Sequence, residues 1–371
     1  MRATEHCLVL LLLLFWIQEV CVFAASVGNP SLLKSKQAAD AKGYIFLTTH
    51  DEIVAQAQKE RKLHVLSSLD AQVLKASAEG FKKKYPFIDV RCEEVSGTEV
   101  YQRMLQEIKA GVAKWDVNYV AFDYYQDYVP HQKKFDILGM AQQGVLKIPA
   151  NLIDPVNRHI VALGGHLQAV AYNKQLIAAE KVPNTWEEFL RPEFSDRKIA
   201  TDVRSVMFAA LVPEWGLEKT VDFAKKLAAQ KPIWLRGVSR IINSVTAGEF
   251  PIGLGVNGAS VLKHQEKDVK GILGLKLVEP IPVRLSSSEG VLATSANPHA
   301  ALLWLEFQSS PEGQKILDEA GLNASALSHD SVQERLIRGK KISLLGWTHY
   351  QNIGRYQQEI VKAFGFPSAG K

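Results

Sequence analysis

The sequence predicts an α/β protein built from two successive lobes, each with helices packed on a largely parallel sheet. From 62 to 122, short apolar runs alternate with segments whose apolar residues recur at helical spacing. This is the βαβαβ pattern of a parallel sheet. A second alternation of the same kind runs from 198 to 256. The length of 371 residues also favours about two domains.

The N-terminus has the features of a cleaved export signal. Arg2 precedes an unbroken apolar run over 8–17, and Val22-Phe23-Ala24 supplies the residues that a signal peptidase reads. We therefore expect residues 1–24 to be a signal peptide that is cleaved after Ala24. An uncleaved membrane anchor is the alternative, although the apolar run is shorter than the roughly 20 residues that span a bilayer.

The first lobe follows a polar stretch at 25–48, which we expect to be a mobile lead-in. Thr49 and Glu52 have the spacing of a capping box, which predicts a helix that continues to about Arg61. The predicted strands of this lobe lie at 63–70, 88–95 and 116–122. Amphipathic segments connect them.

The second lobe is predicted to begin near 165–173, where an extended segment separates the two alternations. Strands are expected at 167–173, 198–202 and 250–256, and helices at 205–212, 217–231 and 240–246. Later in the chain, strands are expected at 274–278 and 289–294, and helices at 300–307 and 350–364. Ser310-Pro311-Glu312 predicts one more helix, because Ser caps a helix N-terminus and Pro is tolerated in the first turn.

Composition excludes some classes of partner. The formal net charge is +5, but the charged residues are dispersed without a basic block, so we expect no nucleic-acid partner. Once the signal peptide is removed, Cys92 is the remaining cysteine. It lies in an alternating apolar and polar run, which favours a buried strand residue over a catalytic thiol.

The sequence lacks the common enzyme motifs: a Walker A loop, His-Glu-x-x-His, Cys-x-x-Cys and a Gly-x-Ser-x-Gly elbow. One match has to be weighed, since Gly253, Gly255 and Gly258 satisfy the dinucleotide fingerprint Gly-x-Gly-x-x-Gly. It would indicate an exported NAD(P)-dependent oxidoreductase. Pro251 lies inside the leading strand, which instead favours a glycine-rich strand end beside a cleft.

The strand ends carry the candidate ligand contacts, because ligands of parallel sheets bind beyond the carboxyl ends of the strands. Hydroxyl and amide donors there complement an anion, whereas carboxylates would face a cation or cap a helix. The candidates are Ser67, Ser68, Asp70, Ser96, Gly97, Thr98 and Asp123. Asp70 and Asp123 are the candidates for a metal, and Ser96 with Glu99 alternatively caps the next helix. The guanidinium groups of Arg204 and Arg240 are candidates to form paired hydrogen bonds with a carboxylate or phosphate.

Several short motifs follow one another along the chain, namely Glu52-x-x-Ala55-x-Ala57-x-x-Glu60, Ser96-Gly97-Thr98-Glu99, Ala121-Phe122-Asp123, Val170-Ala171-Tyr172-Asn173, Pro183-x-Thr185-Trp186, Ala247-Gly248-Glu249 and Ser310-Pro311-Glu312-Gly313. In this order and spacing they resemble the extracellular solute-binding proteins of bacterial ABC importers. The resemblance covers roughly 49–327. Within this group, the sequence resembles the ferric-ion-binding branch of family 1 and its small-anion relatives.

The resemblance implies a type II periplasmic-binding-protein fold, in which two doubly wound lobes are joined by crossing strands and close over one solute like a Venus flytrap. Lobe 1 would comprise 49–170 and 287–326, and lobe 2 would comprise 171–286. A helical tail at 327–371 would pack on one lobe. The resemblance also implies a periplasmic monomer that is not an enzyme, needs no cofactor, and delivers a small solute to an ABC permease in the inner membrane.

The resemblance bears on the solute as well. In the ferric branch, iron is held by a residue after the first strand, a carboxylate after the third, and two adjacent tyrosines. The matching positions here carry Asp70, Ala121 with Asp123 nearby, and Gly258-Ala259. Because the phenolate pair is missing, we do not expect tight ferric coordination. Ferric ion or a ferric chelate remains the alternative solute.

A small organic or phosphorus-containing anion is the expected solute. Ser205 aligns with an anion-binding serine of the family, and Asn257 beside it also favours a small oxyanion or an organic acid. Tyr172, from a matched motif, is a further expected contact. We expect the following residues to converge in one cleft: Ser68, Ser96, Thr98, Ser205 and Asn257.

Overall fold

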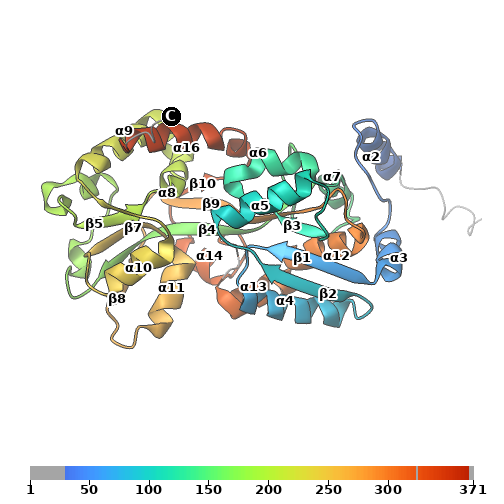
Figure 1. The fold of residues 1–371 in the computed structure, drawn as a ribbon, viewed down its shortest axis with the longest axis horizontal. Helices are drawn as coiled ribbons and strands as arrows, with labels where there is room; N and C mark the ends of the chain where they lie inside the picture. The colour runs from blue at the N-terminus through green and yellow to red at the C-terminus, as the bar shows by residue number, and fades with distance from the viewer. Residues whose placement is uncertain (1–29, 323–324, 367–371) are drawn as a thin grey trace, which may run out of the picture.

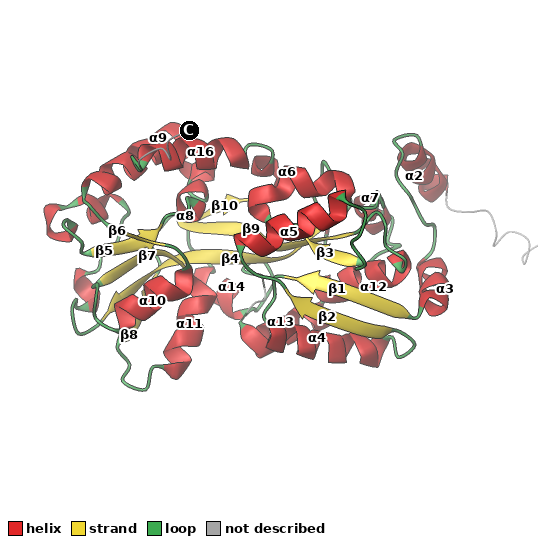
Figure 2. Ribbon diagram, viewed as in Figure 1, coloured by secondary structure: helices red, strands yellow, loops and turns green. Residues whose placement is uncertain are grey.

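The computed structural model describes residues 30–322 and 325–366. Two α/β lobes lie side by side and are joined by two long strands, β4 (Ile160–Asn173) and β9 (Ile281–Val291) (Figure 1). Strands form the middle of each lobe and helices cover them (Figure 2). The predicted signal peptide lies outside the described residues. None of the helices in the described part of the chain has the length and apolar character needed to cross a bilayer.

The first lobe contains the predicted βαβαβ unit. Its elements are β1 (Lys62–Ser67), α4 (Ala71–Lys84), β2 (Asp89–Glu94), α5 (Thr98–Lys109) and β3 (Val117–Tyr119). β1 lies between β2 and β3 and is parallel to both. Val73, Leu74 and Phe81 are buried and lie on one face of α4, which therefore packs on the sheet.

The crossing strands connect the two sheets. β9 pairs antiparallel with β3 through Glu289–Val291, and β4 pairs antiparallel with β9 through residues 160–167. Beyond that point, β4 pairs with the strands of the second lobe. The predicted strand at 167–173 is therefore only the second half of a 14-residue strand.

The second lobe repeats the α/β pattern. Its elements are β5 (Ile199–Asp202), α8 (Val206–Ala209), α9 (Val212–Ala229), β6 (Ile233–Leu235), α10 (Val238–Thr246), β7 (Ile252–Asn257), α11 (Gly258–Lys267) and β8 (Leu273–Lys276). β5 is parallel to β6 and β7, while β7 and β8 pair antiparallel with β4. The carboxyl ends of β5 and β6 thus lie at one edge of this sheet.

The remaining helices and strand are α2 (Pro30–Asp40), α3 (His50–Glu60), α6 (Tyr125–Tyr128), α7 (Ile137–Gln142), α12 (Pro298–Ser309), α13 (Pro311–Gly321), α14 (Val332–Ile337), β10 (Ile342–Leu345), α15 (Trp347–Tyr350) and α16 (Ile353–Ala363). α2 lies in the predicted mobile lead-in, so this stretch contains a helix that the sequence analysis did not predict. Ala39 on this helix is buried, and its carbonyl accepts from the backbone N–H of Tyr44.

The tail also differs from its prediction, because it is not wholly helical. β10 pairs parallel with residues 281–284 of β9. Ser343 and Leu345 point into the protein and are fully buried, so a short strand here adds an edge to the sheet.

Cys92 lies in β2, as expected, and burial raises the pKa of its thiol to about 12.

Two predicted helix caps are confirmed. The hydroxyl of Thr49 accepts from the backbone N–H of Glu52 at 3.1 Å, and that of Ser310 accepts from Gly313 at 3.1 Å. The capping alternative for Ser96 was wrong, because α5 has Gly97 as its N-cap, with a φ of 94°, and no side chain caps it. A φ in this region favours glycine.

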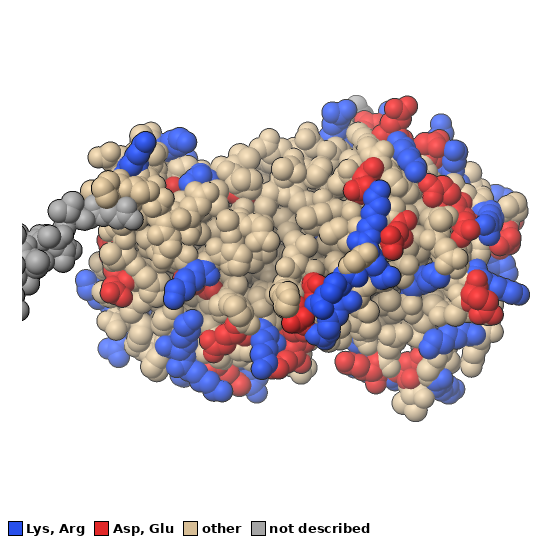
Figure 3. Space-filling model, turned by 180° about the vertical axis from the view of Figure 1, so that it is seen from behind, with Lys and Arg blue, Asp and Glu red and all other residues tan. Residues whose placement is uncertain are grey.

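The surface charge agrees with the dispersed pattern of the sequence. On the face shown in Figure 3, Lys and Arg side chains are interspersed with Asp and Glu, and uncharged surface covers much of the first lobe. A short diagonal run of Lys and Arg side chains crosses the middle of this face, with Asp and Glu side chains beside it.

Candidate functional site

A cavity of about 710 Å³ lies where the two lobes meet. Asp123 reaches it from the first lobe, while most of its lining comes from the ends of β5 and β6 and from α10 in the second lobe. The polar residues that line it on that side are Arg204, Ser205, Arg236 and Arg240. Four predicted contacts therefore share one cavity: Asp123, Arg204, Ser205 and Arg240.

Asp202 at the end of β5 orients Arg204. Its carboxylate accepts from Nε of Arg204 at 3.0 Å and from Nη2 at 2.7 Å. The same carboxylate accepts from the backbone N–H of Gly237, the N-cap of α10, at 3.2 Å. The hydrogen bond with Asp202 raises the pKa of Arg204. One buried carboxylate thus fixes both turns that carry the arginines.

Arg236 and Arg240 flank the N-terminus of α10. Both are exposed, and within the described residues neither makes an ion pair or a side-chain hydrogen bond. Gly237 between them has a φ of 103°, which allows the sharp turn from β6 into the helix. The positive end of the helix dipole and two guanidinium groups therefore lie on the same side of the cavity.

Ser205 contributes a buried hydroxyl. The residue is only 2% exposed, and its Oγ has no hydrogen-bond partner among the described residues. A buried hydroxyl without a partner costs roughly 1–3 kcal/mol. A ligand oxygen in the cavity would supply that partner.

His166 and Arg284 lie where the crossing strands meet. They are register partners on β4 and β9. The guanidinium of Arg284 lies 5.5 Å from the centre of the Phe122 ring, and its Nε is buried without a partner among the described residues. Burial, together with the nearby Arg284 and Lys263, lowers the pKa of His166 to about 3, so His166 is neutral at physiological pH.

Two contacts connect the lobes across the cleft. The ammonium of Lys263 on α11 pairs with the carboxylate of Asp70, which precedes α4. At the other end, the amide of Gln357 on α16 donates to the carboxylate of Asp123 at 2.7 Å. Both aspartates that were candidates for a metal thus already have a partner. Among residues 30–322 and 325–366, no three His, Cys, Asp or Glu side chains lie together as a metal site would require.

The Asp70–Lys263 pair gives a first prediction. A double-mutant cycle with Asp70→Asn and Lys263→Met should give a coupling free energy of about 0.2–1 kcal/mol, the usual range for an exposed ion pair. Urea unfolding measures each variant. Lys267→Met, on the exposed surface of the same helix, should show no coupling to Asp70→Asn. Zero coupling for Lys263 would mean that the pair does not hold the lobes together in solution.

The other predicted contacts lie elsewhere in the molecule. Ser67 is fully buried, and its hydroxyl donates to Glu289 at 2.5 Å, so it belongs to the core of the first lobe. Tyr172 is buried in the second sheet opposite Gly274. The side chain of Asn257 accepts from the N–H of Ser260 at 3.2 Å and caps α11. These three do not line the 710 Å³ cavity.

Four predicted positions remain near strand ends of the first lobe. Ser68 is partly exposed after β1, Ser96 and Gly97 are exposed before α5, and Thr98 begins α5. Ser68, Ser96 and Gly97 do not line the cavity. Ser205, which was expected to converge with them, does line it.

Close packing, rather than dinucleotide binding, explains the Gly-x-Gly-x-x-Gly motif. A Cβ on Gly253 would meet Ile241 at 2.7 Å, and one on Gly258 would overlap the side chain of Leu167. Gly255 has a φ of 72°. The glycines thus allow β7 to pack closely against α8 and α10, and α11 against β4, which accounts for the motif without a phosphate.

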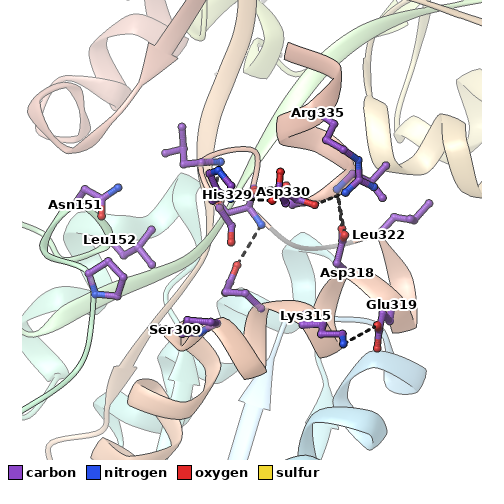
Figure 4. A pocket seen from close by; sticks show the side chains of 18 residues that line it. Asn151, Leu152, Ser309, Lys315, Asp318, Glu319, Leu322, His329, Asp330 and Arg335 are labelled. Carbon is purple, nitrogen blue, oxygen red and sulfur yellow. Dashed lines mark hydrogen bonds and ion pairs between the residues drawn. The ribbon is translucent and has the colours of Figure 1, made fainter. Parts of the chain in front are cut away.

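A second cavity, of about 780 Å³, lies on the first lobe beside α13 and α14 (Figure 4). Its charged side chains are largely paired with one another. Asp318 accepts from the backbone N–H of Val332, and Lys315 pairs with Glu319 at 3.7 Å. Because the second lobe does not reach this cavity, closure of the lobes would not enclose a ligand there. The cleft is therefore the candidate solute site.

Sequence reasoning missed several residues near the junction of the two lobes. Arg284 had a visible signal, since it interrupts the apolar first part of β9. His166 likewise interrupts the apolar run of β4. Lys263 and Gln357 lie on amphipathic helices, and nothing in their local sequence distinguishes them from other exposed residues.

Two α/β lobes joined by crossing strands around a polar cleft define a type II periplasmic binding protein. Solved structures of this class cover most of the chain. Iron-bound HitA from Pseudomonas aeruginosa is 17% identical, with 82% of this chain and 99% of that chain covered and a TM-score of 0.60. The substrate-binding protein of an ABC transporter from Agrobacterium tumefaciens is 22% identical, with 82% and 97% covered and a TM-score of 0.61. Trichodesmium FutA in complex with iron and citrate is 19% identical, with 82% and 98% covered and a TM-score of 0.61.

The chain belongs to the bacterial extracellular solute-binding proteins, whose family model matches residues 117–352. The family and the fold expected from the motifs are thus confirmed. No curated protein sequence matches the chain significantly. The solved structures share the fold, and their solutes differ.

Proposed function

We propose that this protein is the periplasmic solute-binding component of an ABC importer and that it captures a small organic or phosphorus-containing anion. The observation that carries the proposal is the pair Arg236 and Arg240, whose guanidinium groups flank the cavity without a partner among the described residues. Arg204 and the buried hydroxyl of Ser205 lie beside them. Guanidinium groups bind carboxylates and phosphates in a bidentate manner, which gives both affinity and orientation.

Closure of the lobes would strengthen these contacts. Excluding water lowers the local dielectric constant and makes each charge-assisted hydrogen bond stronger. An anion held by the second lobe would contact the first lobe near Asp123, where Gln357 is the hydrogen-bond donor. To shift the lobes from mostly open to mostly closed, the solute must favour the closed state by about 5 kcal/mol. A few charge-assisted bonds can supply this.

In the proposed function the protein binds and releases one solute and makes or breaks no bond. A signal peptide at 1–24 would export it to the periplasm. There a monomer would deliver the solute to an ABC permease in the inner membrane, without a resident cofactor. Family membership supports this role.

Ferric ion is disfavoured by the chemistry of the cleft. Three arginines line the cavity, and positive charge repels a free trivalent cation. The positions where the ferric branch has two tyrosines carry Gly258 and Ala259, which are buried in the first turn of α11. A chelate that presents carboxylates would meet less repulsion, so ferric citrate is included in the test.

A thermal-shift experiment on the purified mature protein tests the proposal. The probes are inorganic phosphate, phenyl phosphate, acetate, phenylacetate, spermidine and ferric citrate. A solute at 100 times its dissociation constant stabilises the native state by about 2.7 kcal/mol. We expect at least one anion to raise the melting temperature and spermidine not to do so. Stabilisation by spermidine alone, or by ferric citrate with phenolate colour, would contradict the proposal, as would a saturable NADPH fluorescence change.

A further inference from the structure

We infer that α16 forms a third wall of the solute cavity, and that the cavity therefore takes an organic anion with an apolar body rather than a bare inorganic oxyanion. The inference rests on the proposed function and deepens it. It assigns binding contacts to a helix that begins directly after residue 352, where the family match ends. Gln357, Val361 and Phe366 from this segment line the cavity.

Aromatic contacts fix the segment on both lobes. On the first lobe, Tyr350 packs against Phe122 at 5.6 Å and against Tyr125 at 5.2 Å. On the second lobe, Phe364 packs against Trp234 at 4.5 Å and against Phe208 at 5.2 Å. α16 itself lies along α8 and α9, at the outer edge of the second lobe (Figure 1). The segment therefore holds its cavity-lining residues in place from both ends.

The cavity has two chemically different sides as a result. The arginines and Ser205 form the polar side. Val361 and Phe366 face the cavity together with Trp234, whose ring lies 4.9 Å from that of Phe366. Gln357 also lines the cavity and donates to Asp123. An anionic group would bind at the arginines while an apolar body contacts the aromatic side.

The volume supports an organic occupant. Pockets of about 300–1,000 Å³ accommodate whole organic molecules, and this cavity holds about 710 Å³. An inorganic phosphate ion would leave most of this space, including the apolar side, to water. Burying apolar surface of the solute there would add affinity that a bare oxyanion cannot gain.

Calorimetric titration with two matched pairs of probes tests the inference: inorganic phosphate against phenyl phosphate, and acetate against phenylacetate. In at least one pair, the aromatic member should bind at least about tenfold more tightly. Val361→Ala should reduce that preference about threefold or more, because it removes apolar contact from the cavity wall. Gln358→Ala, at an exposed position on the same helix, should leave the preference unchanged.

The outcomes separate this inference from the proposed function. If an anion binds but the aromatic member shows no advantage, the inference is wrong and the proposed function stands. The same holds if Val361→Ala and Gln358→Ala give the same preference, because α16 then acts only as a structural element. If no anion binds, the proposed function fails and the inference fails with it.

Discussion

We expect Glu289→Gln to make the protein more stable than the native sequence at pH 8, but equally stable at pH 5. Glu289 lies on β9 and is fully buried. Its carboxyl group accepts from the hydroxyl of Ser67 at 2.5 Å and from the indole N–H of Trp304 at 3.4 Å. No cation pairs with it among the described residues, and burial raises its pKa from 4.5 to about 7.

The direction of the effect follows from proton binding. In the folded protein Glu289 stays protonated up to about pH 7, whereas in the unfolded chain it ionises near pH 4.5. Between these values the folded state binds more protons, so the free energy of unfolding falls as pH rises. The difference between the two pKa values corresponds to a loss of about 3 kcal/mol, complete above pH 7. Gln cannot ionise, so the variant avoids this loss.

Urea unfolding at pH 5 and pH 8 measures the effect. Glu359→Gln on α16 is the control, because this exposed carboxylate should leave the pH dependence unchanged. If the native protein and Glu289→Gln lose the same stability between the two pH values, Glu289 is already ionised in the folded state. The hydrogen bonds from Ser67 and Trp304 would then outweigh burial.

The elements that could be predicted are those whose signal is local. The βαβαβ unit followed from apolar periodicity, and the caps at Thr49 and Ser310 followed from a hydroxyl placed before a helix. The crossing strands were only half predicted. The first half of β4, Ile160–His166, is buried almost throughout, so no polar face alternates with an apolar one. β10 is four residues long and pairs with a strand about 60 residues earlier in the chain, which no local pattern encodes.

Likewise, only some residues of the candidate site could be predicted from the sequence. Asp123, Ser205 and Arg240 follow strands or begin helices, and the topology of parallel sheets brings them to one edge. Ser67 is also at a strand end, but its side chain points into the core, because the direction of a strand residue depends on register. The contact of Gln357 with Asp123 depends on how the C-terminal segment packs between the lobes. That arrangement is a property of the tertiary structure, so the sequence alone did not reveal it.

The largest effect on binding is expected from Arg240→Glu, which should reduce affinity for the anion that stabilises the protein at least about 100-fold. A charge-assisted hydrogen bond contributes about 1.5–3 kcal/mol, and the variant loses it. It also places a carboxylate beside the ligand, and two like charges about 4 Å apart near a protein surface repel by about 4 kcal/mol before salt screening. The lost hydrogen bond corresponds to about one to two orders of magnitude in affinity, and the unscreened repulsion to almost three.

Folding should not be affected, which makes the result easy to interpret. Arg240 is exposed, and exposed substitutions usually change stability by no more than about 0.5 kcal/mol. Arg355→Glu makes the same charge change at an exposed position on α16 that does not line the cavity, so it controls for net charge. Calorimetric titration in 0.15 M salt should separate the two variants clearly. If both bind the anion like the native protein, Arg240 does not contact the solute, and the site lies in another part of the cleft, nearer the Asp70–Lys263 pair.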